Sequence, residues 1–301
     1  MNLKDKESTS SGIYSLSIIT AGCLWGLIGL FSTNLSLGGC SPVEITFIRN
    51  TIAAIGLGVF LFFTKREKLH IHLCDLWMFL GTGILSIVFF NIMYFWTVEL
   101  LPLSMAAILL YTAPCFVMVM SVLLFHEQLT GKKVLALFLA FIGCGFTTGV
   151  IPGIFSGAGL GTIAGFGIFT GICSGFGYAL YSIFGNFAVK KYTSDTISFY
   201  TFLIAAISLL PFCLRWNLLH TLSGTVMAVN AVGIGLVSTM LPFLFYTNGL
   251  RHTDPGKASV MAFVEPMVAT LVSIFILHQG FSFSGVIGIL LIFVSVIILN
   301  I

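Results

Sequence analysis

Ten apolar runs of roughly 20 residues, separated by short polar connections, divide the 301-residue chain and constrain its fold more than any other feature. The runs cover residues 13–35, 42–64, 76–98, 103–125, 131–150, 161–188, 195–214, 226–249, 256–277 and 283–300. Each can cross a bilayer as a helix, whereas lipid offers no hydrogen-bond partner to an open strand. The runs are continuous rather than alternating, which also excludes an outer-membrane barrel. The sequence therefore predicts an all-α polytopic membrane protein with ten transmembrane helices.

The composition agrees with a chain that is embedded in lipid along its whole length. Hydrophobic residues make up 58% of the chain and Asp, Glu, Lys and Arg only 8%, whereas a soluble domain carries roughly a quarter charged residues. The mean hydropathy of +1.10 is spread over the entire sequence, so a single anchor on a globular domain does not explain it. The basic residues are scattered between the apolar runs, which argues against a nucleic-acid-binding face.

Lys and Arg alternate between the connections in a way that predicts the topology. If the N-terminus is cytoplasmic, the cytoplasmic segments collect 11 of the 13 basic residues. They are Lys4, Lys6, Lys65, Arg66, Lys68, Lys132, Lys133, Lys190, Lys191, Arg251 and Lys257. Arg215 falls outside, and Arg49 lies within the second run. The positive-inside rule therefore places both termini in the cytoplasm, in a multi-pass protein of a bacterial-type plasma membrane.

The chain also repeats itself at an offset of 152 residues. The match is clearest where residues 110–114, Leu-Tyr-Thr-Ala-Pro, lie over residues 262–266, Ala-Phe-Val-Glu-Pro. Tyr94 lies over Tyr246 in the same alignment. A self-match in one register, without gaps, indicates two homologous halves.

The odd number of spans in each half determines how the second repeat is oriented relative to the first. Residues 13–150 form the first five-helix repeat and 161–300 the second, after a cytoplasmic tail of residues 1–12. With five spans each, the second repeat enters the membrane from the opposite side, so the two repeats are inverted. Inverted repeats create a central cavity that can open to either side by rocking. The alternative is a duplication retained by a non-transporting scaffold.

Several motifs of the chain are similar to those of one transporter family. They are Cys-Leu-Trp-Gly at 23–26 with a looser counterpart at 175–180, Leu-Ser-Met-Ala-Ala at 103–107 leading to Pro114, Pro-Gly-Lys-Ala-Ser at 255–259 leading to Glu265-Pro266, and His126-Glu127. With these motifs in register with ten spans and the repeat, residues 13–300 resemble the EamA family of the drug/metabolite transporter superfamily. The motifs do not name a substrate.

The resemblance implies a fold and a class of function. It implies ten helices around a cavity lined mainly by spans one, three, four, six, eight and nine. It also implies secondary transport of amino acids, amines or related metabolites, often as efflux and by alternating access. Uptake of a choline-like amine or another metabolite is the alternative within transport. The expected partners are a small-molecule substrate and the lipid bilayer, with proton coupling left open and no nucleic acid.

Two positions depart from the family pattern. His126 replaces the glycine of a Gly-Glu pair that ends span four in the family, and His278-Gln279 replaces the equivalent pair in the second repeat. A role that needs a symmetric pair of loop carboxylates is therefore not supported by this chain.

Glu265 is the carboxylate predicted near the middle of a span, where an ionised group is expensive and by default functional. It shares a helical stripe with Ala258, Ala262 and Ala269 at i, i+4, i+7 and i+11. Its functional interpretations are a proton-coupling carboxylate or a counter-charge for a substrate ammonium. The structural alternative is a side chain that satisfies backbone groups freed by Pro266.

Aromatic and amide side chains complete the predicted substrate or coupling site. The candidates besides Glu265 are Trp25, Asn91, Tyr94, Tyr111, Tyr178 and Tyr246, and Trp96 and Tyr181 are further aromatic residues of the expected cavity spans. Ring faces and hydroxyls of this kind can hold amphipathic or cationic solutes, and the alternative is interfacial belts or ordinary packing. Pro114 and Pro266, at equivalent depths, are predicted helix kinks or hinges, with simple packing kinks as the alternative.

Arg49 and the glycines carry further expectations. Arg49 is expected to snorkel or to pair with Glu44, in preference to binding a substrate carboxylate. The GxxxGxxxG spacing of Gly167, Gly171 and Gly175, which Gly22 and Gly26 repeat in span one, predicts close helix contacts.

Other classes of function find little support in the sequence. We find no HExxH spacing, no Ser-His pairing and no phosphate-binding loop, so an intramembrane enzyme, a metal site, a bound cofactor and an ATP-driven pump are not expected. A binding or scaffold protein would need extramembrane surface that the short connections do not provide.

Overall fold

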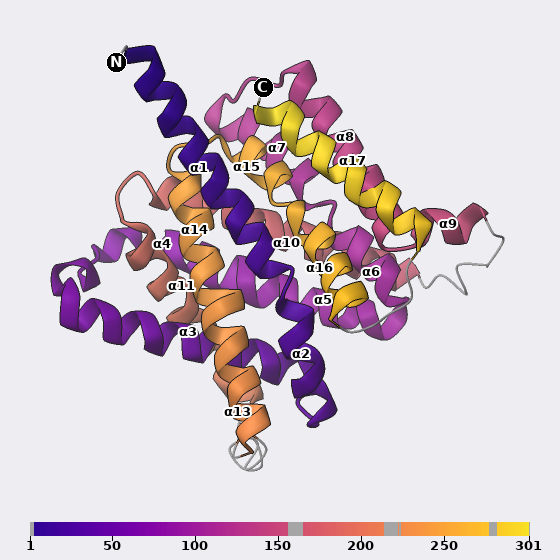
Figure 1. Cartoon of the computed structure of the whole chain (residues 1–301). Coiled ribbons are helices and arrows are strands. Elements are labelled where there is room, and N and C mark those ends of the chain that lie inside the picture. Colours follow the sequence, from indigo (N-terminus) through magenta and orange to yellow (C-terminus); the bar gives the residue numbers. More distant parts are fainter. Residues whose placement is uncertain (1–2, 156–164, 214–221, 223, 277–281, 301) are drawn as a thin grey trace.

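The computed structural model describes residues 3–155, 165–213, 222, 224–276 and 282–300. Within these ranges the chain is a bundle of helices in which nine are long and apolar enough to cross a membrane. A tenth apolar helix, α8 (Gly131–Thr147), has 17 residues, which is at the short end of membrane-spanning lengths. Figure 1 shows the first turns of α1 and the last turns of α17 at the same end of the bundle, as an even number of spans requires.

The first half contains spans one to five. They are α1 (Leu3–Trp25) with α2 (Ile28–Leu37), α3 (Pro42–Thr64), α4 (Leu76–Leu80) with the π-helix Gly81–Val88 and α5 (Phe89–Leu100), α6 (Leu103–Leu110) with α7 (Ala113–Phe125), and α8, followed by the short α9 (Val150–Phe155). The connection between spans two and three carries two 3₁₀ turns, Arg66–Leu69 and Leu73–Asp75.

The second half contains spans six to ten. They are α10 (Gly165–Ala188), α11 (Ser194–Leu209) with the 3₁₀ turn Leu210–Phe212, α13 (Thr225–Val232) with the π-helix Gly233–Met240 and α14 (Leu241–Leu250), α15 (Pro255–Met261) with α16 (Val264–Phe275), and α17 (Phe283–Asn300). These helices confirm the predicted fold class. α1 begins at Leu3, and the part of it that is apolar enough to cross a membrane begins at Gly12.

The packing between the halves is reciprocal. α1 packs against α14, and its counterpart α10 packs against α5. α3 packs against its own counterpart α11, and α8 packs against α17. Pairing of this kind is what two inverted copies of one five-helix unit produce around a pseudo-two-fold axis in the membrane plane.

Glycines permit the closest of these approaches, as their spacing predicts. A Cβ at Gly175 would lie 2.5 Å from Thr112 Oγ1 and 2.8 Å from the carbonyl oxygen of Leu109, so span six lies directly on span four. In span one, a Cβ at Gly26 would lie 2.7 Å from Val268 Cβ in span nine. The two contacts join corresponding pairs of spans, one with nine and six with four, although Gly26 and Gly175 are not at corresponding positions of the repeat, and both connect the two halves.

Helix irregularities follow the repeat as well. The π-helices Gly81–Val88 and Gly233–Met240 lie 152 residues apart, at the same depth of spans three and eight. Spans four and nine are both interrupted, after Leu110 and after Met261. Span one is interrupted after Trp25, whereas α10 is continuous through the corresponding region. The break in span one is therefore the clearest departure from symmetry in the backbone.

Candidate functional site

A cavity of about 670 Å³ lies between the two halves. Its lining reaches Leu37 at the end of α2 and Leu103 at the start of α6, so it opens at the end of the bundle that carries these residues. We call this the open end. The other end, which carries the connections at 65–72, 126–130, 189–193 and 251–254, is called the basic end after its Lys and Arg residues.

Most of the side chains predicted for the site line this cavity. They are Trp25, Asn91, Tyr94, Tyr111, Tyr178 and Glu265. They come from spans one, three, four, six and nine, which are among those that the family resemblance implies. Tyr246 is the exception, because it lies in a smaller space nearer the basic end. The structure brings these residues together, and their individual roles remain predictions.

Glu265 lies in the first turn of α16, just after the interruption of span nine. The N-terminus of a helix carries partial positive charge, which stabilises a carboxylate at this point. The hydroxyl of Tyr178 donates a hydrogen bond to Glu265 Oε2 at 3.3 Å. No hydrogen bond joins the carboxylate to a backbone group of the described residues, so the contacts of Glu265 do not resemble those of a backbone-satisfying side chain.

Asn91 is held in place by its own helix and by span two. Its Nδ2 donates to the carbonyl oxygen of Ile87 at 2.7 Å, and its Oδ1 accepts a hydrogen bond from Thr46 Oγ1 at 3.3 Å. Thr46 also lines the cavity. Nothing in the sequence singles out this threonine, since its partner is 45 residues away along the chain.

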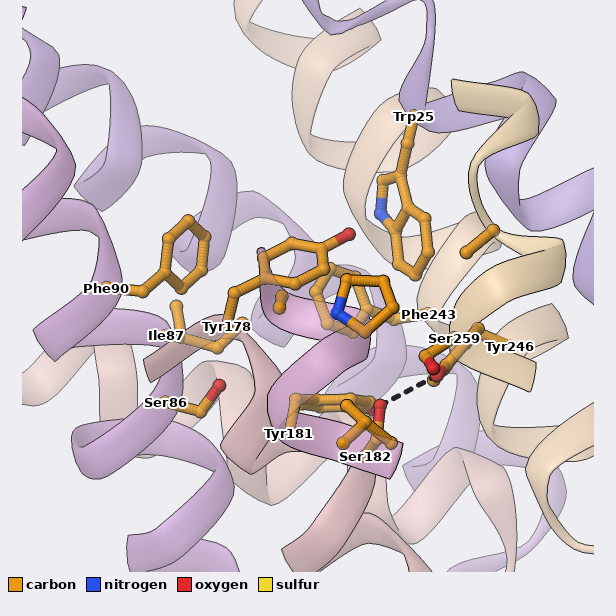
Figure 2. A pocket seen from close by; sticks show the side chains of 14 residues that line it. Trp25, Ser86, Ile87, Phe90, Tyr178, Tyr181, Ser182, Phe243, Tyr246 and Ser259 are labelled. Carbon is orange, nitrogen blue, oxygen red and sulfur yellow. Dashed lines mark hydrogen bonds between the residues drawn. The ribbon is translucent and has the colours of Figure 1, made fainter. Parts of the chain in front are cut away.

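An aromatic layer separates the cavity from the basic end. Trp25 lies with its ring 5.1 Å from that of Phe243 and 5.3 Å from that of Tyr246, and Tyr181 lies 4.8 Å from Phe243. Figure 2 shows these rings around a small space, with the hydrogen bond of 2.7 Å between Ser182 and Tyr246 below them. That space measures about 30 Å³, room for only a few water molecules. The layer therefore blocks a solute from passing toward the basic end.

The two prolines lie at helix starts rather than in helix middles. Pro114 is in the first turn of α7 and Pro266 in the first turn of α16. In a first turn the missing N–H has no intrahelical partner to lose, so proline is well tolerated there. The backbone is redirected just before each proline, where Thr112 N bonds Leu109 O and Phe263 N bonds Val260 O in tight three-residue turns.

Arg49 corrects one expectation. It is buried, with 7% of its surface exposed, and it lines the cavity instead of snorkelling. Its expected partner Glu44 is engaged elsewhere, because Glu44 Oε2 accepts the backbone N–H of Ser41 at 2.7 Å in a capping box at the start of α3. The signal was present in the sequence, since Ser41-Pro42-Val43-Glu44 has the S-x-x-E spacing of a capping box.

Trp96 does not line the cavity. Its side chain is 47% exposed and packs edge-on against Phe166 on the outside of the bundle. It therefore fits the interfacial alternative rather than the cavity. Tyr181 is buried in the aromatic layer and bonds Thr247 at 2.7 Å.

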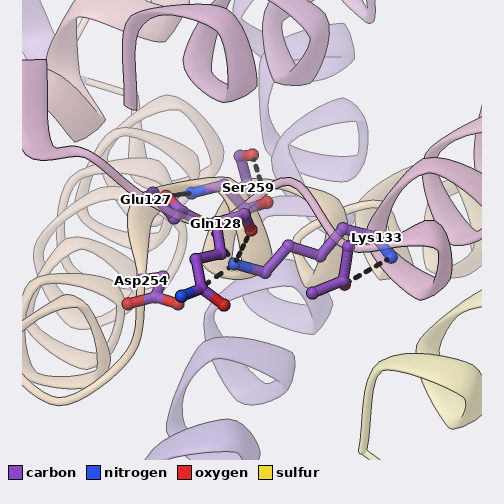
Figure 3. A network of polar contacts seen from close by, with 7 residues as sticks. Glu127, Gln128, Lys133, Asp254 and Ser259 are labelled. Carbon is purple, nitrogen blue, oxygen red and sulfur yellow. Dashed lines mark hydrogen bonds and ion pairs between the residues drawn. The ribbon is translucent and has the colours of Figure 1, made fainter. Parts of the chain in front are cut away.

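Ion pairs close the basic end. Lys133 Nζ lies 2.6 Å from Glu127 Oε1 and 3.1 Å from Asp254 Oδ2, and it also donates to the carbonyl oxygen of Gln128 (Figure 3). Glu127 Oε2 accepts the backbone N–H of Gly256 at 3.2 Å. This network, which we call the Lys133 network, ties the connection between spans four and five to the start of span nine. It joins the two halves across the basic end.

A second ion pair links the halves at the same end. Lys191 Nζ lies 2.6 Å from Asp75 Oδ1, and Tyr192 donates to Asp75 Oδ2 at 2.7 Å. The hydrogen bond with Asp75 raises the pKa of Lys191, so this lysine stays charged. All ion pairs of the described residues lie at the basic end.

The backbone conformation at residue 126 explains the glycine of the family pattern, and His126 adopts it despite its side chain. His126 ends α7 with φ of 56° and ψ of 32°, in the left-handed region where glycine is preferred. The glycine of the family pattern would satisfy this conformation without strain, and Glu127 is then directed to Lys133. Its counterparts in the second repeat, His278 and Gln279, lie outside the described residues.

In the part of the chain that the structure describes, apolar helices form two reciprocal halves around a cavity open at one end, which is the architecture of a polytopic membrane transporter. Residues 12–149 and 165–301 each match the model of the EamA-like transporter family, so the chain belongs to this family and contains two copies of its domain. The predicted family and the predicted duplication are thereby confirmed.

Known relatives agree with this assignment. An uncharacterized transporter of Archaeoglobus fulgidus is 28% identical over 286 residues, which cover 94% of each chain. The uncharacterized inner membrane transporter YicL of Salmonella typhimurium is 26% identical over 139 residues, which cover 46% of each chain. A crystal structure superimposes with a TM-score of 0.79 over 95% of each chain at 18% identity, which shows a shared fold.

Proposed function

We propose that this protein is a secondary transporter that exports amino acids or related amines by alternating access, with Glu265 as the counter-charge for the solute's ammonium group. The observation that carries the proposal is a cavity of about 670 Å³ between inverted halves, lined by a carboxylate at mid-membrane depth. An intramembrane carboxylate is expensive to keep unless it has a function.

The aromatic rings of the cavity wall favour binding of a cationic group next to this carboxylate. Tyr94, Tyr111, Tyr178 and Trp25 present aromatic rings to the same space as Glu265. Aromatic faces attract ammonium groups, most strongly where water is excluded. A carboxylate that binds a cation can also bind a proton, so Glu265 is in addition the proposed site of any proton coupling.

The basic end is proposed to be cytoplasmic. Lysines and arginines of short connections lie on the cytoplasmic side in most membrane proteins, and the connections at 65–72 and 126–130 lie at this end. Both termini are then cytoplasmic. The name of the Salmonella relative, an inner membrane transporter, supports a plasma membrane location.

With this orientation the cavity faces outward and the cytoplasmic side is closed. Inward opening requires the aromatic layer around Phe243 to separate and the Lys133 network to break. The interruptions before Pro114 and Pro266 are the proposed hinges, because spans four and nine already change direction there. They would let the outer halves of these spans close over the cavity while the inner halves part.

Transport by purified protein in proteoliposomes tests this function. The vesicles are loaded with labelled amino acids or with choline and simple primary amines, with and without a pH gradient. We expect saturable flux of at least one ammonium-bearing solute. A flux that follows the pH gradient supports coupling, and choline uptake without amino acid flux supports the alternative solute class. Absence of flux for every solute of the panel contradicts the proposal.

A further inference from the structure

Arg49 is a buried arginine in the middle of the described bundle. It lies on α3 with 7% of its surface exposed, and its Nε has no hydrogen-bond partner. None of its guanidinium nitrogens forms a hydrogen bond or an ion pair with the described residues. A guanidinium carries five N–H donors in a fixed planar fork, and burying it without partners is strongly unfavourable.

The fold itself does not require an arginine at this depth. The repeat places Thr201 at the corresponding position of span seven, and Thr201 is fully buried and shares a hydrogen bond of 2.6 Å with Thr82. In the second half, a small side chain whose hydroxyl is hydrogen-bonded therefore fills the corresponding position between the helices. The difference indicates that Arg49 is retained for something other than helix packing.

The cavity gives Arg49 access to a ligand, whereas the surrounding protein gives it no partner. Arg49 lines the same cavity as Glu265, yet none of its nitrogens lies within 4.0 Å of the Glu265 carboxylate oxygens. The two opposite charges thus face one space without neutralising each other directly. A ligand with one positive and one negative group can contact both.

We propose that Arg49 is the subsite for a substrate carboxylate, and that the transported solute is a zwitterion held between Arg49 and Glu265. The inference rests on the proposed transport function and narrows its substrate class to α-amino acids. The forked guanidinium matches the two oxygens of a carboxylate, and charge-assisted pairs of this geometry are the stronger kind of hydrogen bond.

The rest of the cavity suits such a solute. Ile28, Ile45, Phe90 and Phe243 contribute apolar side chains to the lining of the cavity that Arg49 and Glu265 share. An apolar side chain of the amino acid would be desolvated against this wall, which adds affinity without further polar contacts.

Binding to the purified full-length protein in detergent tests the subsite. The probes are the neutral L-amino acids, the amines formed from them by decarboxylation, and the carboxylic acids that lack the amino group. We expect at least one amino acid to bind about 10- to 100-fold more tightly than its own amine, since the carboxylate contact is a charge-assisted one.

Variants separate recognition from folding. Arg49→Gln is expected to weaken amino acid binding to the level of the amine while amine binding changes little. Arg49→Lys, which keeps the charge but not the fork, is expected to fall between the two. Arg66→Gln, the same substitution at an arginine that packs over the Phe62 ring outside the cavity, is the matched control and should leave both affinities unchanged.

Three results would overturn the inference. They are equal affinity of wild-type protein for amino acid and amine, unchanged amino acid affinity in Arg49→Gln, and no binding of any amino acid. If amines are transported but amino acids are neither bound nor transported, the transport function stands and the zwitterion subsite fails. If no solute of either class is transported, the proposed function fails first.

Discussion

The two repeats share one scaffold but not one chemistry. Both contain a π-helix in their third span, an interrupted fourth span and a glycine contact to the other half. Yet Glu265 of the second repeat corresponds to Ala113 of the first, and Arg49 of the first corresponds to Thr201 of the second. Features present twice belong to the architecture, and features present once mark the places where the protein has been specialised.

The same contrast distinguishes the two ends of the bundle. Glu127 and Lys133 close the basic end, whereas the repeat places Gly285 opposite Lys133 at the open end. The described residues of the open end contribute no ion pair, so different contacts hold the two ends of the bundle together.

Glu265→Gln is expected to have the largest effect, because it removes the carboxylate that is present in the second repeat and absent from the first. If the unpaired carboxylate of the second repeat binds the solute, its loss should lower the transport rate about 10- to 100-fold, the value of one charge-assisted contact. Transport into proteoliposomes measures this. Glu99→Gln, at an exposed carboxylate at the end of α5, is the matched control and should transport normally. A normal rate and normal pH dependence in Glu265→Gln would refute the role of the carboxylate.

The glycine contacts should behave alike in both halves. Gly26→Ala and Gly175→Ala each place a Cβ within 3 Å of neighbouring atoms in the other half, and each should destabilise the fold by roughly 1–3 kcal/mol. Thermal unfolding of the purified variants in detergent measures this. Gly131→Ala, where nothing lies within 4 Å of the new Cβ, should not be destabilised. A large effect at one glycine and none at the other would show that the two span contacts between the halves are not equally tight.

Lys133→Ala tests whether the Lys133 network keeps the basic end of the bundle closed. Without Lys133, Glu127 and Asp254 lose their shared partner, and opening of the basic end should become about tenfold more favourable. A single cysteine at Ser86, in the small space below the aromatic layer, should then react correspondingly faster with a maleimide applied from the basic end. An unchanged labelling rate would mean that the Lys133 network does not hold this end closed.

His126→Gly should have the smallest effect. Glycine adopts the left-handed conformation of residue 126 without the steric strain of a side chain, so the free energy of unfolding of the variant should rise by about 1 kcal/mol. A rise of a few degrees in the unfolding temperature is expected, with unchanged transport. A lower unfolding temperature would mean that the histidine side chain contributes a contact that outweighs the backbone strain.

Much of this comparison can be predicted from the sequence, because apolar length and a repeat offset are one-dimensional signals. The ten spans and the duplication follow from them, whereas the gathering of Trp25, Asn91 and Tyr94 is implied only by the family resemblance. The π-helices do not, since hydropathy is insensitive to one extra residue in a turn. The placement of Tyr246 in the aromatic layer, and not in the open cavity, also depends on side-chain direction, which span assignment does not give.

Arg49 shows where prediction from the sequence fails for physical reasons. Proximity in sequence favoured Glu44 as its partner, but the helix start at Ser41 competes for that carboxylate and wins. Charge pairing in a membrane protein is decided between helices, and the group that shares a cavity with Arg49 is Glu265, more than two hundred residues away. Only the packed structure brings them to one site.

The most direct test of a single central site reached alternately from both ends is the accessibility of one cysteine. Phe90 lines both the open cavity and the small space beneath it, so Phe90→Cys is placed in a protein whose seven native cysteines are replaced. A membrane-impermeant maleimide is then applied to vesicles of either orientation, with and without a transported solute. We predict labelling from both ends, with the solute changing the ratio of the two rates. Labelling from the open end alone under every condition would contradict alternating access.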